Sequence, residues 1–273
     1  MIDKNKLEVC WISGMPRSGT TWLSQIFASS PEVRLKFCPL FSYEFKNLLD
    51  ERSSAEQWSK LFSDVYTTSS EFLDQDHLRK SGLVPSFKIK KKYPKCLVIK
   101  STRFHNLTPN ILDLNKEIKF IHLVRHPCAS IYSWITNSNE FPSDSDPLMH
   151  WKSGACRKTA PSEYWGFDDW KKVTVQALRL NKKYPKRHKI ICYEELLADT
   201  EKKAIELFNF LDLPFTDRTQ SFIQLSHSRH DSHQHSVFKN INFKNQWESL
   251  LDKEIISTCI NEVVGTELEQ FLK

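Results

Sequence analysis

The sequence contains no hydrophobic run long enough to cross a membrane, and no two of its seven cysteines have Cys-x-x-Cys spacing. The number of cysteines is odd, and several lie in apolar runs, which favours buried free thiols over a disulfide framework. Residues 1–8 are charged and lead at once into an apolar segment, so no secretory signal is expected. Together these absences predict a cytoplasmic protein.

The chain also lacks internal repeats, low-complexity tracts and linkers, so we expect one domain over residues 1–273. With 40% hydrophobic residues, it can bury a large core between packed layers of secondary structure. The net charge of +6 favours anionic ligands. The lysines are spread along the chain, with one dense run at residues 88–92 that we expect to be a solvated turn, and we expect neither a nucleic acid nor a membrane as partner.

Short apolar runs alternate with helical patterns. The predicted strands are 9–12, 97–99, 118–124 and 190–193. Predicted helices are 20–28, a helix entered at Pro127 that continues over 129–135, and one with its N-cap at Asp199 or Thr200 that runs through Leu211. This order predicts an α/β fold with a mostly parallel central sheet and helices on both faces. We also expect residues 37–76 to be helical and 138–164 to form an irregular excursion over the site.

Polar side chains follow the predicted strands at the points where those strands end. Arg17, Lys100, Arg125 and Tyr193 each lie at or just past the end of an apolar run. Ligands of parallel α/β sheets bind at the carboxyl ends of the strands. We therefore expect these four side chains to share one site.

The segment Gly14–Leu23 has the spacing Gly-x₄-Gly-x-Thr of a phosphate-binding loop between a strand and a helix. Such a turn directs backbone N–H groups, here those of Ser18 to Thr21, and the positive end of a helix dipole at an anion. The lysine usual in nucleotide-hydrolysing enzymes is missing, because Thr20 occupies its position. Arg17 supplies the positive charge instead, so a phosphate is expected without the usual lysine–magnesium chemistry.

A kinase or ATPase would also place an acidic residue at the end of a neighbouring strand to hold magnesium. Here that strand ends in Arg125, which can bind a phosphate through two hydrogen bonds, and Ser133 follows about two helical turns later. This arrangement favours a nucleotide held by protein cations with no required metal. A nucleotide kinase or ATPase on a similar sheet is the alternative.

These segments resemble the sulfotransferase family that uses 3′-phosphoadenosine-5′-phosphosulfate (PAPS). Gly14 to Trp22 is similar to its 5′-phosphosulfate loop, and Arg125 to Ser133 to its 3′-phosphate motif. The run 193–196 resembles its Tyr-Glu-Asp-Leu segment. Residues 238–240, followed by Trp247, resemble its cofactor-closing loop and the Trp element beyond it.

The resemblance implies a P-loop NTPase-like sulfotransferase fold and an enzyme that transfers a sulfuryl group from PAPS. The acceptor would be a hydroxyl or amine of a small molecule or natural product, and the product adenosine 3′,5′-bisphosphate (PAP). The implied cofactor-binding residues are Arg17, Ser18, Gly19, Thr20, Thr21, Trp22, Arg125, Ser133, Tyr193, Phe238, Lys239 and Asn240. For the aromatic residues Trp22 and Tyr193, contact with the adenine and packing in the core both remain open.

Lys100 matches the lysine of the family's Lys-Thr-His segment, but Thr102 occupies the position of the catalytic histidine. The candidates for the general base are Glu44, then His105, with Glu140 third. Arg17 and Lys100 complete the predicted catalytic set. Because the usual base is missing, a non-catalytic module that binds PAP or PAPS is a second alternative.

Two further groups remain ambiguous from the sequence. A histidine cluster over residues 227–235 matches no zinc spacing, so we expect a solvated loop near the cofactor and no metal. Four tryptophans are candidates either for core packing or for lining an acceptor pocket: Trp134, Trp151, Trp165 and Trp170. The acceptor and the oligomeric state stay open.

Overall fold

The computed structural model describes residues 7–87, 91–239 and 246–273. Its centre is a five-stranded sheet with the order β2-β3-β1-β4-β5. The strands are β1 (Glu8–Gly14), β2 (Val33–Phe37), β3 (Cys96–Lys100), β4 (Lys119–Val124) and β5 (His188–Cys192). Every neighbouring pair is parallel, so the carboxyl ends of all strands meet at one edge. The predicted α/β class with a parallel sheet is confirmed.

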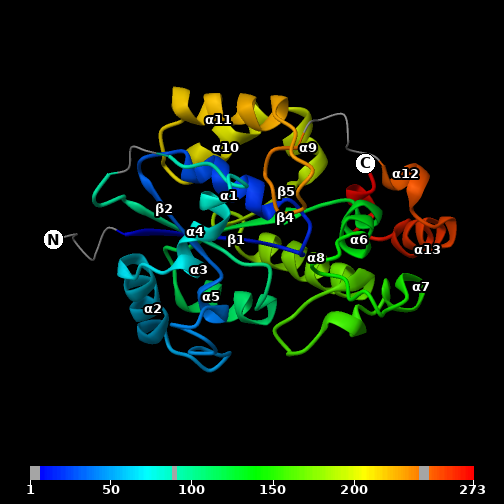
Figure 1. The fold of residues 1–273 in the computed structure, drawn as a ribbon. Coiled ribbons are helices and arrows are strands. Elements are labelled where there is room, and N and C mark those ends of the chain that lie inside the picture. The colour runs from blue at the N-terminus through cyan, green and yellow to red at the C-terminus, as the bar shows by residue number, and fades with distance from the viewer. Residues whose placement is uncertain (1–6, 88–90, 240–245) are drawn as a thin grey trace.

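Helices cover both faces of the sheet (Figure 1). One face carries α1 (Thr20–Ala28), α9 (Tyr193–Ala198), α10 (Thr200–Phe210) and α11 (Asp217–Ser228). The other carries α2 (Ala55–Thr67), α5 (Thr108–Leu114) and α8 (Gly166–Lys183). Two short helices, α3 (Glu71–Asp74) and α4 (Asp76–Lys80), precede β3. At the right of Figure 1, α6 (Pro127–Ile135), α7 (Pro147–His150), α12 (Trp247–Leu250) and α13 (Lys253–Val263) lie together.

Side chains along the buried strands point alternately to the two faces of the sheet, and each face has its own core. In β1, Cys10 and Ile12 are fully buried and pack in the cluster that contains α1 and α10. Trp11 points to the other face, where its ring contacts Trp58 of α2 and stacks on Phe120. Because successive side chains of a strand point to opposite faces, one apolar run supplies both cores. Both faces of the sheet that carries the strand ends are therefore packed against core side chains.

Most predicted elements are confirmed, and the exceptions have identifiable causes. Strand β2 was not predicted because its five residues include Arg34 and Lys36. Lys36 is nevertheless buried, since it donates hydrogen bonds to the Thr68 carbonyl and to Asp74. The expectation of a helical segment over 37–76 is wrong for its first part: only a 3-10 turn at Pro39–Phe41 forms before α2. Within the predicted irregular segment, α7 and a 3-10 turn at Ala155–Arg157 are short regular pieces.

All seven cysteines are free, and all but Cys156 are buried, as the sequence predicts. Within the described ranges, no helix combines the length and the apolar character that crossing a membrane requires.

Candidate functional site

The loop between β1 and α1 has a conformation that depends on glycine. Gly19 has a φ of 89° and lies against the ring of Tyr193, where a Cβ atom would come within 2.5 Å of that ring. Arg17 has a positive φ of 67°, which is uncommon for a residue with a side chain. These conformations turn the chain so that α1 begins at Thr20, beside Tyr193.

Four consecutive amides at this turn have no hydrogen-bond partner among the described residues. The Ser18 N–H donates to the Met15 carbonyl, and the first helical bond runs from Leu23 to Gly19. The intervening N–H groups, those of Gly19 to Trp22, have no hydrogen-bond partner within the described chain. The Ser18 amide, which the sequence assigned to the anion, is thus used inside the loop. Unpaired helix-start amides form an anion site together with the helix dipole.

The guanidinium of Arg17 lies at the centre of a polar network. Its Nε donates to Ser133 Oγ at 3.1 Å, and its Nη2 donates to the Gln234 carbonyl at 3.2 Å. Glu140 Oε2 lies 3.6 Å from its Nη1. Burial lowers the pKa of Arg17, and the neighbouring Arg125 lowers it further, while Glu140 raises it. Arginine remains charged despite such shifts, so Arg17 acts as a fixed cation.

A second cation, Arg125, follows β4 and contacts three other residues. Its Nη1 donates to the Arg17 carbonyl at 3.0 Å, and its guanidinium lies 4.9 Å from the centroid of the Tyr193 ring. Trp170 donates to the Arg125 carbonyl at 2.9 Å. The Arg125 Nε is buried and has no partner among the described atoms. An anion that accepted from this nitrogen would satisfy it.

Lys100 ends β3 and is buried, with only 6% of its surface exposed. Its ammonium lies 4.6 Å from the centroid of the Phe37 ring and forms no hydrogen bond or ion pair with any described residue. Burial lowers its pKa to about 8, although Cys38 and Glu140 act in the opposite direction. A desolvated ammonium with no partner is prepared to bind an anion that enters the site.

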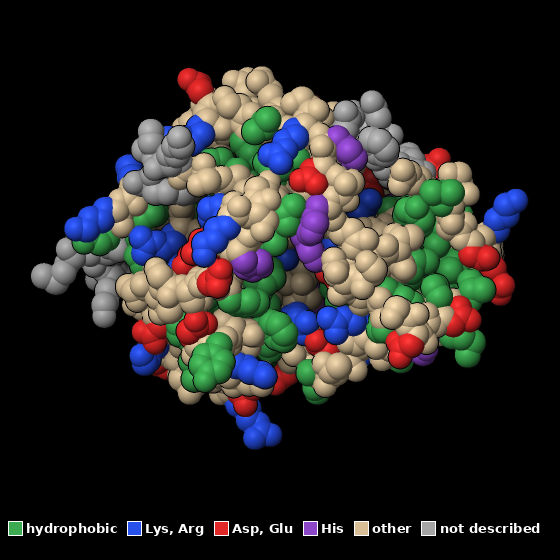
Figure 2. All heavy atoms as spheres, in the orientation of Figure 1, with side chains coloured by type: hydrophobic (Ala, Val, Ile, Leu, Met, Phe, Trp, Pro, Cys, Tyr) green, Lys and Arg blue, Asp and Glu red, His purple; other side chains and the backbone are tan. Residues whose placement is uncertain are grey.

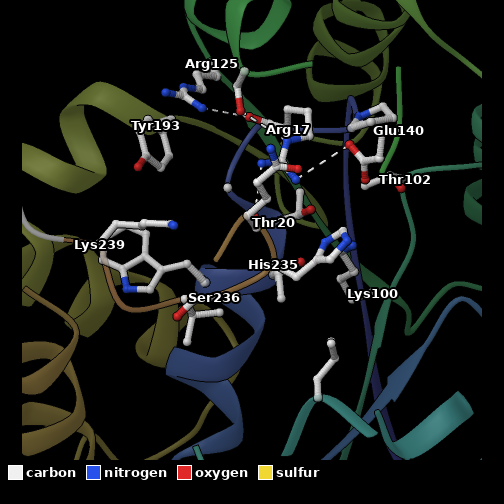
Figure 3. Close-up of a pocket in the computed structure, with 18 of the residues that line it drawn as sticks. Arg17, Thr20, Lys100, Thr102, Arg125, Glu140, Tyr193, His235, Ser236 and Lys239 are labelled. Carbon is white, nitrogen blue, oxygen red and sulfur yellow. Dashed lines mark hydrogen bonds and ion pairs between the residues drawn. The ribbon is translucent and has the colours of Figure 1, made fainter. Parts of the chain in front are cut away.

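These groups line one cavity of about 750 Å³ at the carboxyl edge of the sheet. Figure 2 shows the hollow at the centre of this face, bordered by basic and histidine side chains. In Figure 3, Arg125 and Tyr193 lie on one side of Arg17, and Glu140 and Thr102 on the other. Four predicted residues, Arg17, Lys100, Arg125 and Tyr193, therefore do meet in one site.

The family model described as the sulfotransferase family matches residues 11–217, which include the loop with Arg17, and also Lys100 and Arg125. The chain belongs to the sulfotransferase family. No curated protein matches the chain by sequence.

Solved structures support the same fold. The mouse sulfotransferase SULT7A1 complexed with PAP is 16% identical, with 97% of this chain and 88% of that chain covered at a TM-score of 0.57. A sulfotransferase domain from the curacin biosynthetic pathway is 17% identical, with coverages of 94% and 97% and a TM-score of 0.53. Retinol dehydratase in a complex with retinol and PAP is 14% identical, with coverages of 95% and 82% and a TM-score of 0.55.

The residues predicted to bind the nucleotide in this sulfotransferase do not all line the cavity. Gly19, Thr20, Thr21, Trp22, Ser133 and Lys239 line the cavity, whereas Ser18 and Phe238 do not, and Asn240 lies outside the described residues. Trp22 is at once part of the core and part of the cavity wall, and its Nε1 donates to Ser226 Oγ. Phe238 is 2% exposed and packs in the core. Lys239 donates to the carbonyls of Asp231 and His233.

The three candidate bases are separated by the structure. Glu44 is exposed in the segment after the 3-10 turn and does not line the described cavity wall. His105 is buried behind that wall, and burial lowers its pKa to about 4. Glu140, the third candidate, is the one carboxylate among the described residues that line the cavity.

The remaining predictions concern the histidines and tryptophans. His227, His230 and His235 line the cavity, and within the described ranges no set of three metal-ligating side chains is placed to hold an ion. Of the four tryptophans, Trp165 lines the cavity, while the other three pack in the core.

Sequence reasoning missed two basic side chains in the cavity wall, Arg103 and Arg157. It also gave His235 no role, although this ring lies in the electrostatic neighbourhood of Glu140, Arg17 and Lys100. Burial lowers the pKa of His235, and Arg17 and Lys100 act in the same direction, while Glu140 opposes them. No local pattern marks these residues, because each reaches the cavity from a loop or a short turn whose path depends on packing.

Proposed function

We propose that this sulfotransferase moves a sulfuryl group from PAPS to a hydroxyl or amine of a small acceptor and releases PAP. The observation that carries the proposal is the presence of two anion-binding sets in one cavity, the loop amides with Arg17 and the Arg125–Tyr193 pair. The PAP complexes of the mouse enzyme and of retinol dehydratase give it further support. The free, mostly buried cysteines are consistent with action in the cytoplasm.

The residues present fit a nucleotide with two phosphate groups. The unpaired amides of Gly19 to Trp22 suit a 5′-phosphate, and the unsatisfied Arg125 Nε suits a 3′-phosphate. Tyr193 and Trp22 offer aromatic surface to an adenine. Ser133, whose hydroxyl accepts from Arg17, joins the two sets, and Lys239 contributes another cation to the same wall.

PAPS supplies an activated sulfuryl group whose leaving phosphate becomes more negative as the bond to sulfur breaks. We assign Arg17 and the loop amides to this charge, which they stabilise electrostatically without donating a proton. Lys100 lines the same cavity and, as a desolvated cation, stabilises the charge on the transferring group. Fixed cations in a buried site act more strongly than cations in water.

We assign the general base to Glu140 rather than to Glu44 or His105, because of the three it alone lines the cavity. Its carboxylate accepts the acceptor proton while the acceptor oxygen or nitrogen bonds to sulfur. The electrons of the breaking sulfur–oxygen bond remain on the bridging oxygen of PAP. The ion pair with Arg17 orients the Glu140 carboxylate toward the cavity.

Transfer of a radiolabelled sulfuryl group from PAPS to a panel of phenols, alcohols, amines and sugars tests the proposal. We expect transfer to at least one acceptor class and stronger binding of PAP than of ATP with Mg²⁺. Preference for ATP with Mg²⁺ would support the kinase alternative. Tight PAP binding with no transfer across the panel would support the non-catalytic alternative.

A further inference from the structure

Besides the residues assigned to the nucleotide, the cavity wall contains aromatic rings and basic side chains. The rings include those of Phe37, Phe41, Phe72, Tyr132, Tyr164 and Trp165. Two arginines, Arg103 and Arg157, lie in the same wall. Glu140 is the one carboxylate lining the described cavity, and it is paired with Arg17.

The two arginines differ in their partners. Arg103 is committed to the protein, since it forms an ion pair with the buried Glu163 and its guanidinium lies over the Phe41 ring. Arg157 has no hydrogen bond or ion pair from its side chain to any described residue. Its Nε is buried, and its guanidinium lies 5.8 Å from the centroid of the Trp165 ring. An unsatisfied buried donor is costly unless a ligand satisfies it.

The proposed donor does not account for Arg157. The two phosphates and the sulfuryl group are matched by Arg17, Lys100 and Arg125 together with the loop amides. Arg157 belongs to the 3-10 turn at Ala155–Arg157, which is separate in sequence from the loop at 14–23 and from Arg125. Arg157 nevertheless lines the cavity, so its unsatisfied Nε is left for a ligand other than the donor.

We propose that the acceptor is a small aromatic molecule with an anionic group, and that Arg157 binds this group beside Trp165. The proposal rests on the proposed function, because it names the acceptor class of that reaction. The planar guanidinium forms two parallel hydrogen bonds with a carboxylate, and the indole packs against the aromatic body of the acceptor.

The test uses 6-hydroxy-2-naphthoate and its methyl ester, which differ in charge and share one ring system. Their dissociation constants are measured by calorimetry, with and without PAP, for the wild type, Arg157→Gln and Arg157→Lys. The matched control is Arg52→Gln, which removes an exposed arginine that does not line the cavity.

We expect the wild type and the Arg52→Gln control to bind the carboxylate about tenfold to a hundredfold more tightly than the ester, the usual worth of a charged hydrogen bond. Arg157→Gln brings this ratio close to one, and Arg157→Lys restores part of it. PAP affinity stays unchanged in both Arg157 variants.

An unchanged ratio in Arg157→Gln, a wild-type preference for the ester, or no carboxylate binding at millimolar concentration would each overturn the proposal. The two proposals fail separately. Carboxylate preference without PAP binding contradicts the proposed donor alone, and PAP binding without carboxylate preference contradicts the acceptor class alone.

Discussion

Replacing Gly19 with alanine tests whether the contact between the loop and Tyr193 builds the nucleotide site. A Cβ atom at Gly19 would lie 2.5 Å from Cε2 and 2.6 Å from Cδ2 of that ring. Optimal carbon–carbon contacts are about 3.5–4.0 Å, so the ring has to move by about 1 Å. Because the Arg125 guanidinium lies over the same ring, the displacement reaches the proposed 3′-phosphate site.

The substitution also strains the backbone, and the chain offers a control for that effect. Gly19 and Gly82 both have left-handed φ values, 89° and 69°, but a Cβ at Gly82 meets nothing within 4 Å. A residue with a side chain in this region costs about 1–2 kcal/mol. Gly82→Ala therefore reports the strain alone, while Gly19→Ala adds the displacement of Tyr193.

The assays are urea unfolding and calorimetric titration with PAP. Strain alone removes about 1–2 kcal/mol of unfolding free energy from Gly82→Ala, and Gly19→Ala loses at least as much. Only Gly19→Ala raises the dissociation constant of PAP, by about tenfold or more, or about 1.4 kcal/mol. Equal PAP affinity in the two variants would refute the role given to the Tyr193 ring.

Other predictions follow from single groups. Arg125→Ala weakens binding of PAP far more than binding of ATP in titrations, and equal losses would remove the 3′-phosphate assignment. As pH rises through about 8, Lys100 loses its proton, so kcat/KM for PAPS falls there; in Lys100→Arg the fall moves to higher pH, and an unshifted profile contradicts this. Glu140→Gln lowers kcat by about 10²–10⁴-fold, whereas the exposed Glu44→Gln control stays active; the reverse order would reassign the base. Sulfuryl transfer persists with a chelator, and strict metal dependence would exclude the proposal of catalysis by protein cations alone.

Local pattern was sufficient for the sheet and for the principal cations. The apolar runs that form β1, β3, β4 and β5 are long enough to be recognised in the sequence. Arg17, Lys100 and Arg125 lie at or just past the ends of three of these strands. Since parallel strands end at one edge, order along the chain already implied that these side chains meet. Strand β2 was not predicted, because Lys36 can be buried there only when it donates hydrogen bonds to residues 68 and 74.

Position along the chain did not show which candidate for the general base lines the cavity. Glu44 and His105 were preferred for their places in the sequence, yet one is exposed and the other is buried behind the wall. Glu140 reaches Arg17 from across 123 positions of sequence only because the excursion after α6 packs over the site.

Local periodicity and short motifs were enough to predict the fold class and the family, and they also led to the proposal of an anion-binding site. Packing in three dimensions decides which carboxylate lines the cavity, and which amides and which cavity arginine have no hydrogen-bond partner among the described residues. Those properties depend on contacts between residues distant in the chain, such as Gly19 with Tyr193 and Arg103 with Glu163. No local pattern encodes such contacts, since they arise when separate elements pack together.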